Sequence, residues 1–325
     1  MPIHDIHEPS PFFEYIRLED ESLPEARRDS IDVALLDMNH SWPNVGHDAL
    51  VHVVLEASLA LRDELERRAM KVRVLSFDVR RRNAIPPSPN GSFQLYIGTG
   101  GPGHLDPRLN DGTNEWSQGV AESDAWEAPL FRLFDEILTD RTAAMIAVCH
   151  SFGLVCRWSG AAVPILRDEK SSGMPLNRLS REALQHPWFA QFALELPDRQ
   201  HFRVVDNRLF DLILESPGKS QPIAFEAGGS TALTMIELAR DASGEMPRFL
   251  GVNHHPEIID REHIMQVLDT KRAHGEVSDQ WYDERAITMR DLFHGENERQ
   301  SRLTSKFTLI EPVKFHLAKA IAQRE

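Results

Sequence analysis

Residues 143–158 read AAMIAVCHSFGLVCRW, an apolar run that leads directly into a helical pattern. A short apolar run of this kind is typical of a strand buried in a parallel sheet. Cys149 would then lie in the tight turn between strand and helix, where a nucleophile is exposed at the carboxyl edge of the sheet. A helix N-terminus lowers the pKa of a thiol there and offers N–H groups to an oxyanion. A buried structural cysteine is the alternative for Cys149, and core packing is the interpretation of Cys156.

The chain on both sides of this turn alternates apolar runs with helical patterns. Strands are predicted at 31–38, 72–77, 93–97, 204–214, 222–227 and 250–253, and helices at 48–70 and 123–140. Such alternation indicates parallel β-α-β units. We therefore expect an α/β fold in which a doubly wound, mostly parallel sheet is flanked by helices.

Three segments are expected along the chain. Residues 1–29 contain four prolines and many charges, and are interpreted as an N-terminal arm laid over the domain. Residues 30–259 would form the α/β domain, and 260–325 a charged helical extension packed on the core. For that extension, a docking surface and a lid are the alternatives to plain packing.

The 325 residues carry a formal net charge of −14, from 50 acidic and 36 basic side chains. A surface of this sign repels phosphates, so nucleic acid is not expected as a partner. The sequence has no apolar run long enough for a membrane span, and its two cysteines are too few for a disulfide framework. These features lead us to expect a cytoplasmic protein. No cofactor is expected, and no metal site, because the histidines fit no ligand spacing. The basic run at 80–82 is interpreted as a solvated strand end, with recognition of an acidic substrate or partner as the alternative.

A thiolate nucleophile needs a base, and the base needs a group that orients it. Residues 250–257 read LGVNHHPE, an apolar strand that ends in His255, a proline and Glu257. The two-residue spacing allows Glu257 to hold one imidazole nitrogen of His255 while the other nitrogen faces the sulfur. On its own, a His-Pro-Glu stretch is better explained by a surface loop.

The glycine-rich loop GTGGPG occupies residues 98–103, directly after the predicted strand at 93–97. Glycines allow the backbone to approach a ligand and to turn an N–H group towards it. A phosphate cradle and a plain turn are alternatives for such a loop. A P-loop is excluded, because no Lys-Ser or Lys-Thr pair follows the glycines.

Taken together and in this order, the three motifs resemble those of the class I glutamine amidotransferase family. Its members share a Gly-Gly-Pro-Gly loop, a Gly-x-Cys-x-Gly-x-Gln turn and a Gly-Val-x-x-His-Pro-Glu strand end. Here these stand as GGPG at 100–103, AVCHSFG at 147–153 and GVNHHPE at 251–257. The resemblance covers residues 31 to about 260 and implies a flavodoxin-like fold.

By this resemblance the chain would be a cysteine amidohydrolase. Cys149 would attack a side-chain amide carbonyl and form a thioester. His255 would protonate the departing ammonia and then activate water, while Glu257 orients the imidazole. The backbone N–H groups of Gly101 and His150 would form the oxyanion hole.

The same resemblance places substrate contacts at Gly100, Ser151 and Asn207. The family's glutamine four residues past the cysteine is Gly153 here. The family's Ser-His pair upstream of the triad histidine has no clear match, and residues 205–208 occupy its approximate place. The thiol chemistry is therefore expected to be retained, with glutamine, a γ-glutamyl compound or another amide as the substrate.

Two other functions and two kinds of partner stay open. His150 beside Cys149 also resembles the Cys-His elbow of the intracellular protease and deglycase family, in which the 255–257 stretch has no role. A non-catalytic binding or assembly subunit is the third interpretation. Because no synthetase domain is predicted in the chain, it either acts alone or supplies ammonia to a synthetase subunit. A homodimer is also considered.

Overall fold

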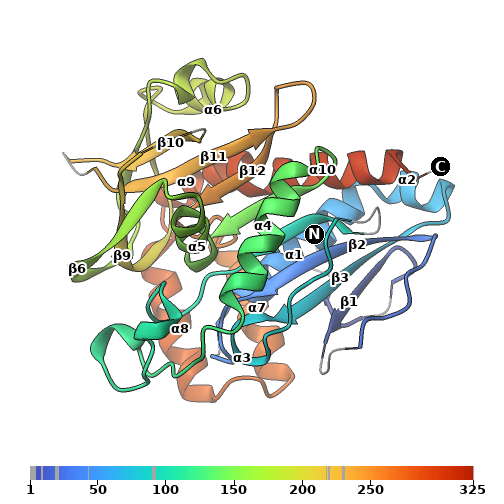
Figure 1. The fold of residues 1–325 in the computed structure, drawn as a ribbon, viewed down its shortest axis with the longest axis horizontal. Helices are drawn as coiled ribbons and strands as arrows, with labels where there is room; N and C mark the ends of the chain where they lie inside the picture. The colour runs from blue at the N-terminus through green and yellow to red at the C-terminus, as the bar shows by residue number, and fades with distance from the viewer. Residues whose placement is uncertain are drawn as a thin grey trace.

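The apolar run before Cys149 forms β5 (Ala144–Val148), one strand of a ten-stranded sheet (Figure 1). The computed structural model describes residues 5–8, 10–18, 22–42, 44–89, 93–216, 218, 220–228 and 231–324. Six strands run parallel: β1 (Phe13–Arg17), β2 (Ser30–Asp37), β3 (Lys71–Asp78), β4 (Phe93–Gly98), β5 and β12 (Pro247–Val252). Four antiparallel strands continue the sheet: β11 (Leu233–Arg240), β10 (Gln221–Glu226), β7 (Leu176–Leu179) and β8 (His201–Arg203).

The strand order is β1-β3-β2-β4-β5-β12-β11-β10-β7-β8. The chain therefore winds in opposite directions from β2, and open α/β sheets bind ligands at the carboxyl ends of strands beside such a reversal. Register pairs Gly98 with Ala147, and Val148 with Val252, so β4, β5 and β12 end at the same edge. The predicted α/β fold with a mostly parallel sheet is confirmed.

Helices cover both faces of the sheet, as Figure 1 shows. One face carries α1 (Gly46–Ala60) and α10 (Glu311–Ala322), and the other carries α4 (Glu127–Thr139) and α5 (His150–Ser159). Successive strand residues point to opposite faces. Val33 accordingly packs in the core with α1 and α10, while its neighbour Ala34 packs in the core with α4 and α5.

Shorter elements connect these layers. They are α2 (Arg62–Arg67), α3 (Val79–Arg82), α6 (Phe189–Glu195) and the 3-10 turns η1 (Pro107–Leu109), η2 (Glu115–Ser117) and η3 (Ala183–Gln185). A separate two-stranded antiparallel ribbon is formed by β6 (Ala162–Gly173) and β9 (Asp206–Leu214).

Two parts of the sheet differ from the sequence prediction. Residues 13–17, expected in an arm laid over the domain, form β1 at the edge of the sheet. An edge strand has only one partner strand and tolerates the charged residues that suggested an arm. The strands β6, β7, β8 and β11 were not predicted, and the strand predicted at 204–214 forms β9, which begins two residues later at Asp206. Their short mixed patterns do not distinguish a strand from a helix segment.

The expected helical extension consists of α7 (Arg261–Ala273), α8 (Asp279–Leu292), α9 (Glu296–Ser305), a π-helical turn (Lys306–Ile310) and α10. α10 joins the main core through Val313 and Leu317. In α9, the hydroxyl of Ser301 donates to the carbonyl of Ile258 over 2.8 Å. The extension is thus attached both to the sheet and to the stretch that follows β12. Within the described residues, none of the helices combines the length and apolar character needed for a membrane crossing.

Because of its buried histidines, we expect the protein to lose stability in acid. Burial lowers the pKa of His52 and His316 to about 4 and that of His254 to about 3, from an ordinary 6.5. Between about pH 4 and 6.5 the unfolded chain therefore binds protons that the folded chain does not. Its free energy of unfolding should fall on acidification, by at most about 1.4 kcal/mol per pH unit for each histidine. Urea unfolding at about pH 7.5 and 5.5 measures this loss, and unchanged midpoints would contradict it.

Candidate active site

Cys149 occupies the turn between β5 and α5. Its φ of 50° and ψ of −103° lie in a region that side chains other than glycine rarely adopt. Two hydrogen bonds hold the turn: the N–H of Cys149 donates to the carbonyl of Val252 over 2.8 Å, and the N–H of Gly153 donates to the carbonyl of Cys149 over 3.0 Å. The side chain of Cys149 is partly exposed. Cys156 is buried, and burial raises the pKa of its thiol.

The thiol of Cys149 and the imidazole of His255 meet beside Gly100. A Cβ atom built on Gly100 would lie 3.7 Å from Cys149 Sγ and 3.0 Å from His255 Cε1, so the two side chains flank the same glycine. The other side of the imidazole is held by Glu257, because Nδ1 lies 2.7 Å from Oε1. Burial alone would lower the pKa of His255, but the charges of Glu257 and of the Cys149 sulfur raise it well above its ordinary value.

Glu257 is buried where the chain leaves β12 and passes the start of α1. Its side chain is 1% exposed. A Cβ atom on Gly46 would lie 2.7 Å from Glu257 Oε1, so the glycine makes room for the carboxylate. The adjacent carbonyl of Pro256 accepts a 2.5 Å hydrogen bond from Ser305 of α9. The His-Pro-Glu stretch is therefore fixed from both sides, by α1 and by the C-terminal extension.

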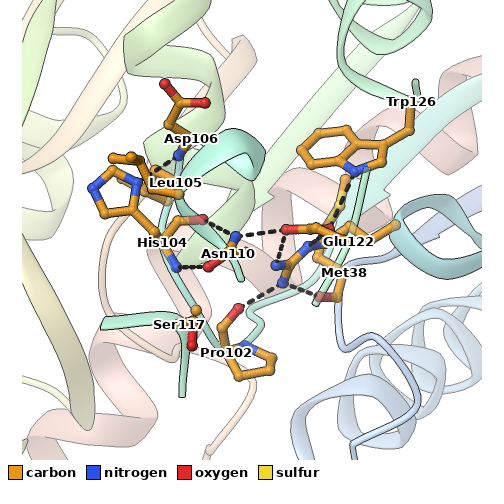
Figure 2. Close-up of polar contacts among 12 residues, drawn as sticks. Met38, Pro102, His104, Leu105, Asp106, Asn110, Ser117, Glu122 and Trp126 are labelled. Atoms are coloured by element: carbon orange, nitrogen blue, oxygen red, sulfur yellow. Dashed lines mark hydrogen bonds and ion pairs between the residues drawn. The ribbon is translucent and has the colours of Figure 1, made fainter. Parts of the chain in front are cut away.

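A buried arginine fixes the glycine loop from behind. Nη1 of Arg80 donates to the carbonyls of Met38 and Pro102 over 2.9 and 2.6 Å, and Nη2 lies 2.5 Å from Glu122 Oε1. Figure 2 shows the contacts around Met38, Pro102 and Glu122. The side chains of Arg80 and Glu122 are 0% and 1% exposed. The interpretation of residues 80–82 as a solvated strand end is therefore wrong for Arg80.

The same network extends to the segment that follows the loop. Asn110 Nδ2 donates to Glu122 Oε1 over 2.6 Å, and Asn110 Oδ1 accepts the N–H of His104 over 2.7 Å (Figure 2). At the start of the loop, Thr99 Oγ1 accepts the N–H of Met38 over 2.9 Å. These contacts leave the loop little freedom, which is what a preorganised oxyanion site requires.

The N–H groups predicted to hold the oxyanion belong to Gly101 and His150. In the described part of the chain, no hydrogen bond uses either group as a donor. His150 is buried, its imidazole contacts the backbone of Gly101, and its Nε2 finds no partner among the described residues. Burial and the charges of Arg80 and Arg157 lower the pKa of His150 well below its ordinary value. Its imidazole is therefore neutral, in contrast to that of His255.

Ser151, predicted as a substrate contact, is buried next to the glycine loop. Its hydroxyl donates to the carbonyl of Thr99 over 2.7 Å and so joins the start of α5 to the glycine loop. The residue does not line the cavity described below. Gly153, four residues past the cysteine, makes room for another side chain. A Cβ atom there would lie 2.5 Å from Leu105 Cδ2, so an apolar residue occupies that space.

A cavity of about 730 Å³ opens in front of Cys149 and His255. Gly100 lines it beside the thiol, and Asn207 lines it as an exposed residue of β9. A third wall comes from α8, whose Trp281 and other side chains face the same space. The extension thus borders the cavity, and the interpretation of that segment as plain packing is incomplete.

Two buried polar residues of this cavity were missed from the sequence. Asp206 Oδ2 accepts hydrogen bonds from Ser171 Oγ and Arg208 Nη1 over 2.6 and 2.8 Å, and burial raises the pKa of Asp206. Asn253 precedes the two histidines. Asp206 Oδ1 and Asn253 Nδ2 have no hydrogen-bond partner in the described part of the chain. Asp206 directly precedes the predicted substrate contact Asn207, but no spacing marked either Asp206 or Asn253 as a cavity residue.

The described residues contain no cluster of three or more histidine, cysteine or carboxylate side chains arranged to hold a metal ion. The groups beside the thiol are instead an imidazole, a carboxylate and backbone N–H donors. This set of groups can ionise a thiol, move a proton and bind a developing negative charge on oxygen.

No protein-family model matches the chain, and neither does any curated protein sequence. Solved structures with a similar backbone exist. A glutamine amidotransferase from Thermotoga maritima is 12% identical, with 90% of this chain and 97% of that one covered and a TM-score of 0.48. A glutamine amido transferase from Methylobacillus flagellatus is 14% identical, with coverage of 89% and 94% and a TM-score of 0.49. Likeness at this level concerns the path of the backbone, so the chemistry must be argued from the chain's own residues.

Proposed function

We propose that the chain is a cysteine amidohydrolase that cleaves glutamine or a γ-glutamyl amide through a Cys149 thioester. The observation that carries the proposal is that the Cys149 thiol and the His255 imidazole both lie beside Gly100, with Glu257 on the far nitrogen of the imidazole. A thiol, a base and an orienting carboxylate are the groups that acyl transfer requires.

The reaction follows from these positions. The Cys149 thiolate attacks the amide carbonyl carbon, and the C=O electron pair moves onto oxygen. The imidazolium of His255 gives its proton to the amide nitrogen as the C–N bond breaks, which releases ammonia or an amine and leaves a thioester. The neutral imidazole then takes a proton from water as the water attacks the thioester. Collapse of this second intermediate releases the carboxylic acid and regenerates Cys149.

The oxyanion of both intermediates would be held by the N–H groups of Gly101 and His150. Both belong to rigid backbone, one in the loop pinned by Arg80 and one at the start of α5. Donors that are already oriented need no reorganisation when charge develops, and one such donor contributes about 10²–10³-fold to kcat.

The two alternatives have less support. An elbow hydrolase that uses His150 as its base needs an imidazole that can take up a proton, and the surroundings of His150 oppose this. A purely non-catalytic subunit has no use for a strained cysteine paired with an oriented imidazole. Water is the acceptor that the proposal requires, and transfer of ammonia to a synthetase subunit would be an addition to it.

The test is a screen for ammonia or amine release over glutamine, asparagine, free γ-glutamyl amides and simple aliphatic amides. The blank is the same protein after alkylation with iodoacetamide, with the modified cysteine identified by mass spectrometry. Release that alkylation of Cys149 abolishes would support the proposal. Absence of release from every amide, or release that survives full alkylation, would overturn it.

Gly101→Ala should lower kcat by about 100-fold, because the substitution displaces an oxyanion donor. A Cβ atom at this position would lie 2.2 Å from the carbonyl oxygen of Met38 and 3.2 Å from Arg80 Nη1, so the backbone must move. The rate of Cys149 alkylation should stay unchanged, because alkylation forms no oxyanion. Gly244→Ala is the control for a loss of stability alone: nothing lies within 4 Å of a Cβ atom there, but the φ of 76° disfavours alanine, and the residue does not line the cavity. Equal kcat values for the Gly101 variant and the parent chain would exclude this donor.

A further inference from the structure

The charged side chains that line the catalytic cavity form an inner and an outer set. The inner set is paired: Asp206 with Arg208 over 2.8 Å, and His255 with Glu257 over 2.7 Å. The outer set consists of Lys170 and Arg285. Both are exposed, and neither forms an ion pair with any described side chain. The cavity therefore has a balanced interior and a positively charged outer part.

The two outer cations belong to separate walls. Lys170 lies on β6 of the two-stranded ribbon, and Arg285 lies on α8 of the extension. The guanidinium carbon of Arg285 lies 5.4 Å from the ring centroid of Trp281, which also lines the cavity. Contact with an aromatic face limits the positions of a long side chain. A ligand in the cavity can thus meet positive charge from two directions.

The volume of the cavity and the net charge of the chain indicate what kind of ligand these cations attract. A volume of about 730 Å³ lies in the range of pockets for drug-sized ligands, of about 300–1,000 Å³, and exceeds what one amino acid fills. The chain as a whole carries a net charge of −14. On such a background, unpaired cations at a cavity attract anions locally, where the rest of the surface repels them.

We propose that Lys170 and Arg285 form a distal anion subsite, so that the substrate is an elongated amide with a carboxylate beyond the scissile bond. This inference rests on the proposed function and specifies its substrate class. The acyl group lies at Cys149, and the leaving amine extends between β6 and α8 with its anionic end at the two cations. The apolar side chain of Leu105, which lines the same cavity and packs against Gly153, suits the uncharged part of such a substrate.

The subsite can be tested on thiol reactivity, without amide cleavage. Cys149 is labelled with maleimidohexanoic acid and with its uncharged primary amide, at low ionic strength. In the parent chain the acid should react about tenfold faster than the amide, after correction for their rates with a small thiol. In the double variant Lys170→Met with Arg285→Met the ratio should fall to about one. Arg290→Met is the control: Arg290 is exposed on the same helix but does not line the cavity.

Hydrolysis supplies a second readout for the same variants. The substrates are γ-glutamyl nitroanilide and its ring-carboxylated derivative, which share one scissile bond. The double variant should raise KM for the carboxylated compound about tenfold and leave kcat, and both constants for the neutral compound, unchanged. Equal labelling rates for acid and amide in a chain whose Cys149 still reacts would overturn the subsite alone. A Cys149 inert to both reagents would overturn the proposed function, and the subsite with it.

Discussion

Cys149→Ala is expected to lower the rate of amide hydrolysis by about 10⁴-fold or more, the largest effect that we predict for a single substitution. Without the sulfur no thioester forms, and the oxyanion donors and imidazole can only assist direct attack by water. The sequence provides its own matched control, because the chain has a second cysteine seven positions further along. Cys156→Ala removes the same atoms from a buried position in α5, where burial raises the pKa of the thiol.

The two variants should have opposite effects on activity and on stability. Cys156→Ala should keep its activity and lose about 1–2 kcal/mol of unfolding free energy, because it deletes a buried apolar group. Cys149→Ala should leave the stability nearly unchanged, since the lost thiol is partly exposed and alanine meets the same backbone strain in the turn. Release of ammonia or amine and urea unfolding measure the two quantities. Comparable activity in both variants would show that the thioester is not formed at Cys149.

The nucleophile turn at Cys149 and its partner groups could largely be predicted from the sequence. The run at 143–148 predicted a buried strand, and β5 occupies Ala144–Val148. The stretch at 250–257 predicted an imidazole beside a carboxylate, and Nδ1 of His255 lies 2.7 Å from Glu257. These predictions were possible because each depends on local chain geometry: a strand end, a proline and a two-residue spacing. Parallel pairing of β5 with β12 then brings the two motifs to one edge.

Contacts between distant segments could not be predicted in this way. Arg80 belongs to a run of three arginines, and nothing in the run shows that only one of them is buried beneath the glycine loop. Gly46 resembles any glycine at a helix start, yet a Cβ atom there would reach the carboxylate of Glu257. Trp281 of α8 lies 132 positions after Cys149, and no periodicity indicates that the two face one cavity. Long-range packing determines all three features.

His255→Asn is the second substitution with a large expected effect, about 10³-fold or more on kcat, because the same imidazole ionises the thiol and protonates the leaving amine. Its matched control is His150→Asn, at the other histidine beside the sulfur. The side chain of His150 carries no proton-transfer role in the proposed reaction, and its surroundings keep it neutral. We expect the His150 variant to retain kcat within about tenfold, with the residual loss arising from altered packing at the oxyanion loop.

The pH dependence of alkylation separates the two roles more sharply than kcat does. In the parent chain, the imidazolium of His255 persists to high pH, because Glu257 and the sulfur raise its pKa. A thiolate stabilised by that cation should react with iodoacetamide even at about pH 6. In His255→Asn that cation is absent, so the alkylation rate should rise steeply between about pH 6 and 8. Only the histidine that acts as the cation beside the sulfur should, when replaced, make the alkylation rate strongly dependent on pH. A steep pH dependence in His150→Asn and a shallow one in His255→Asn would therefore assign the base to His150 and support the elbow-hydrolase alternative.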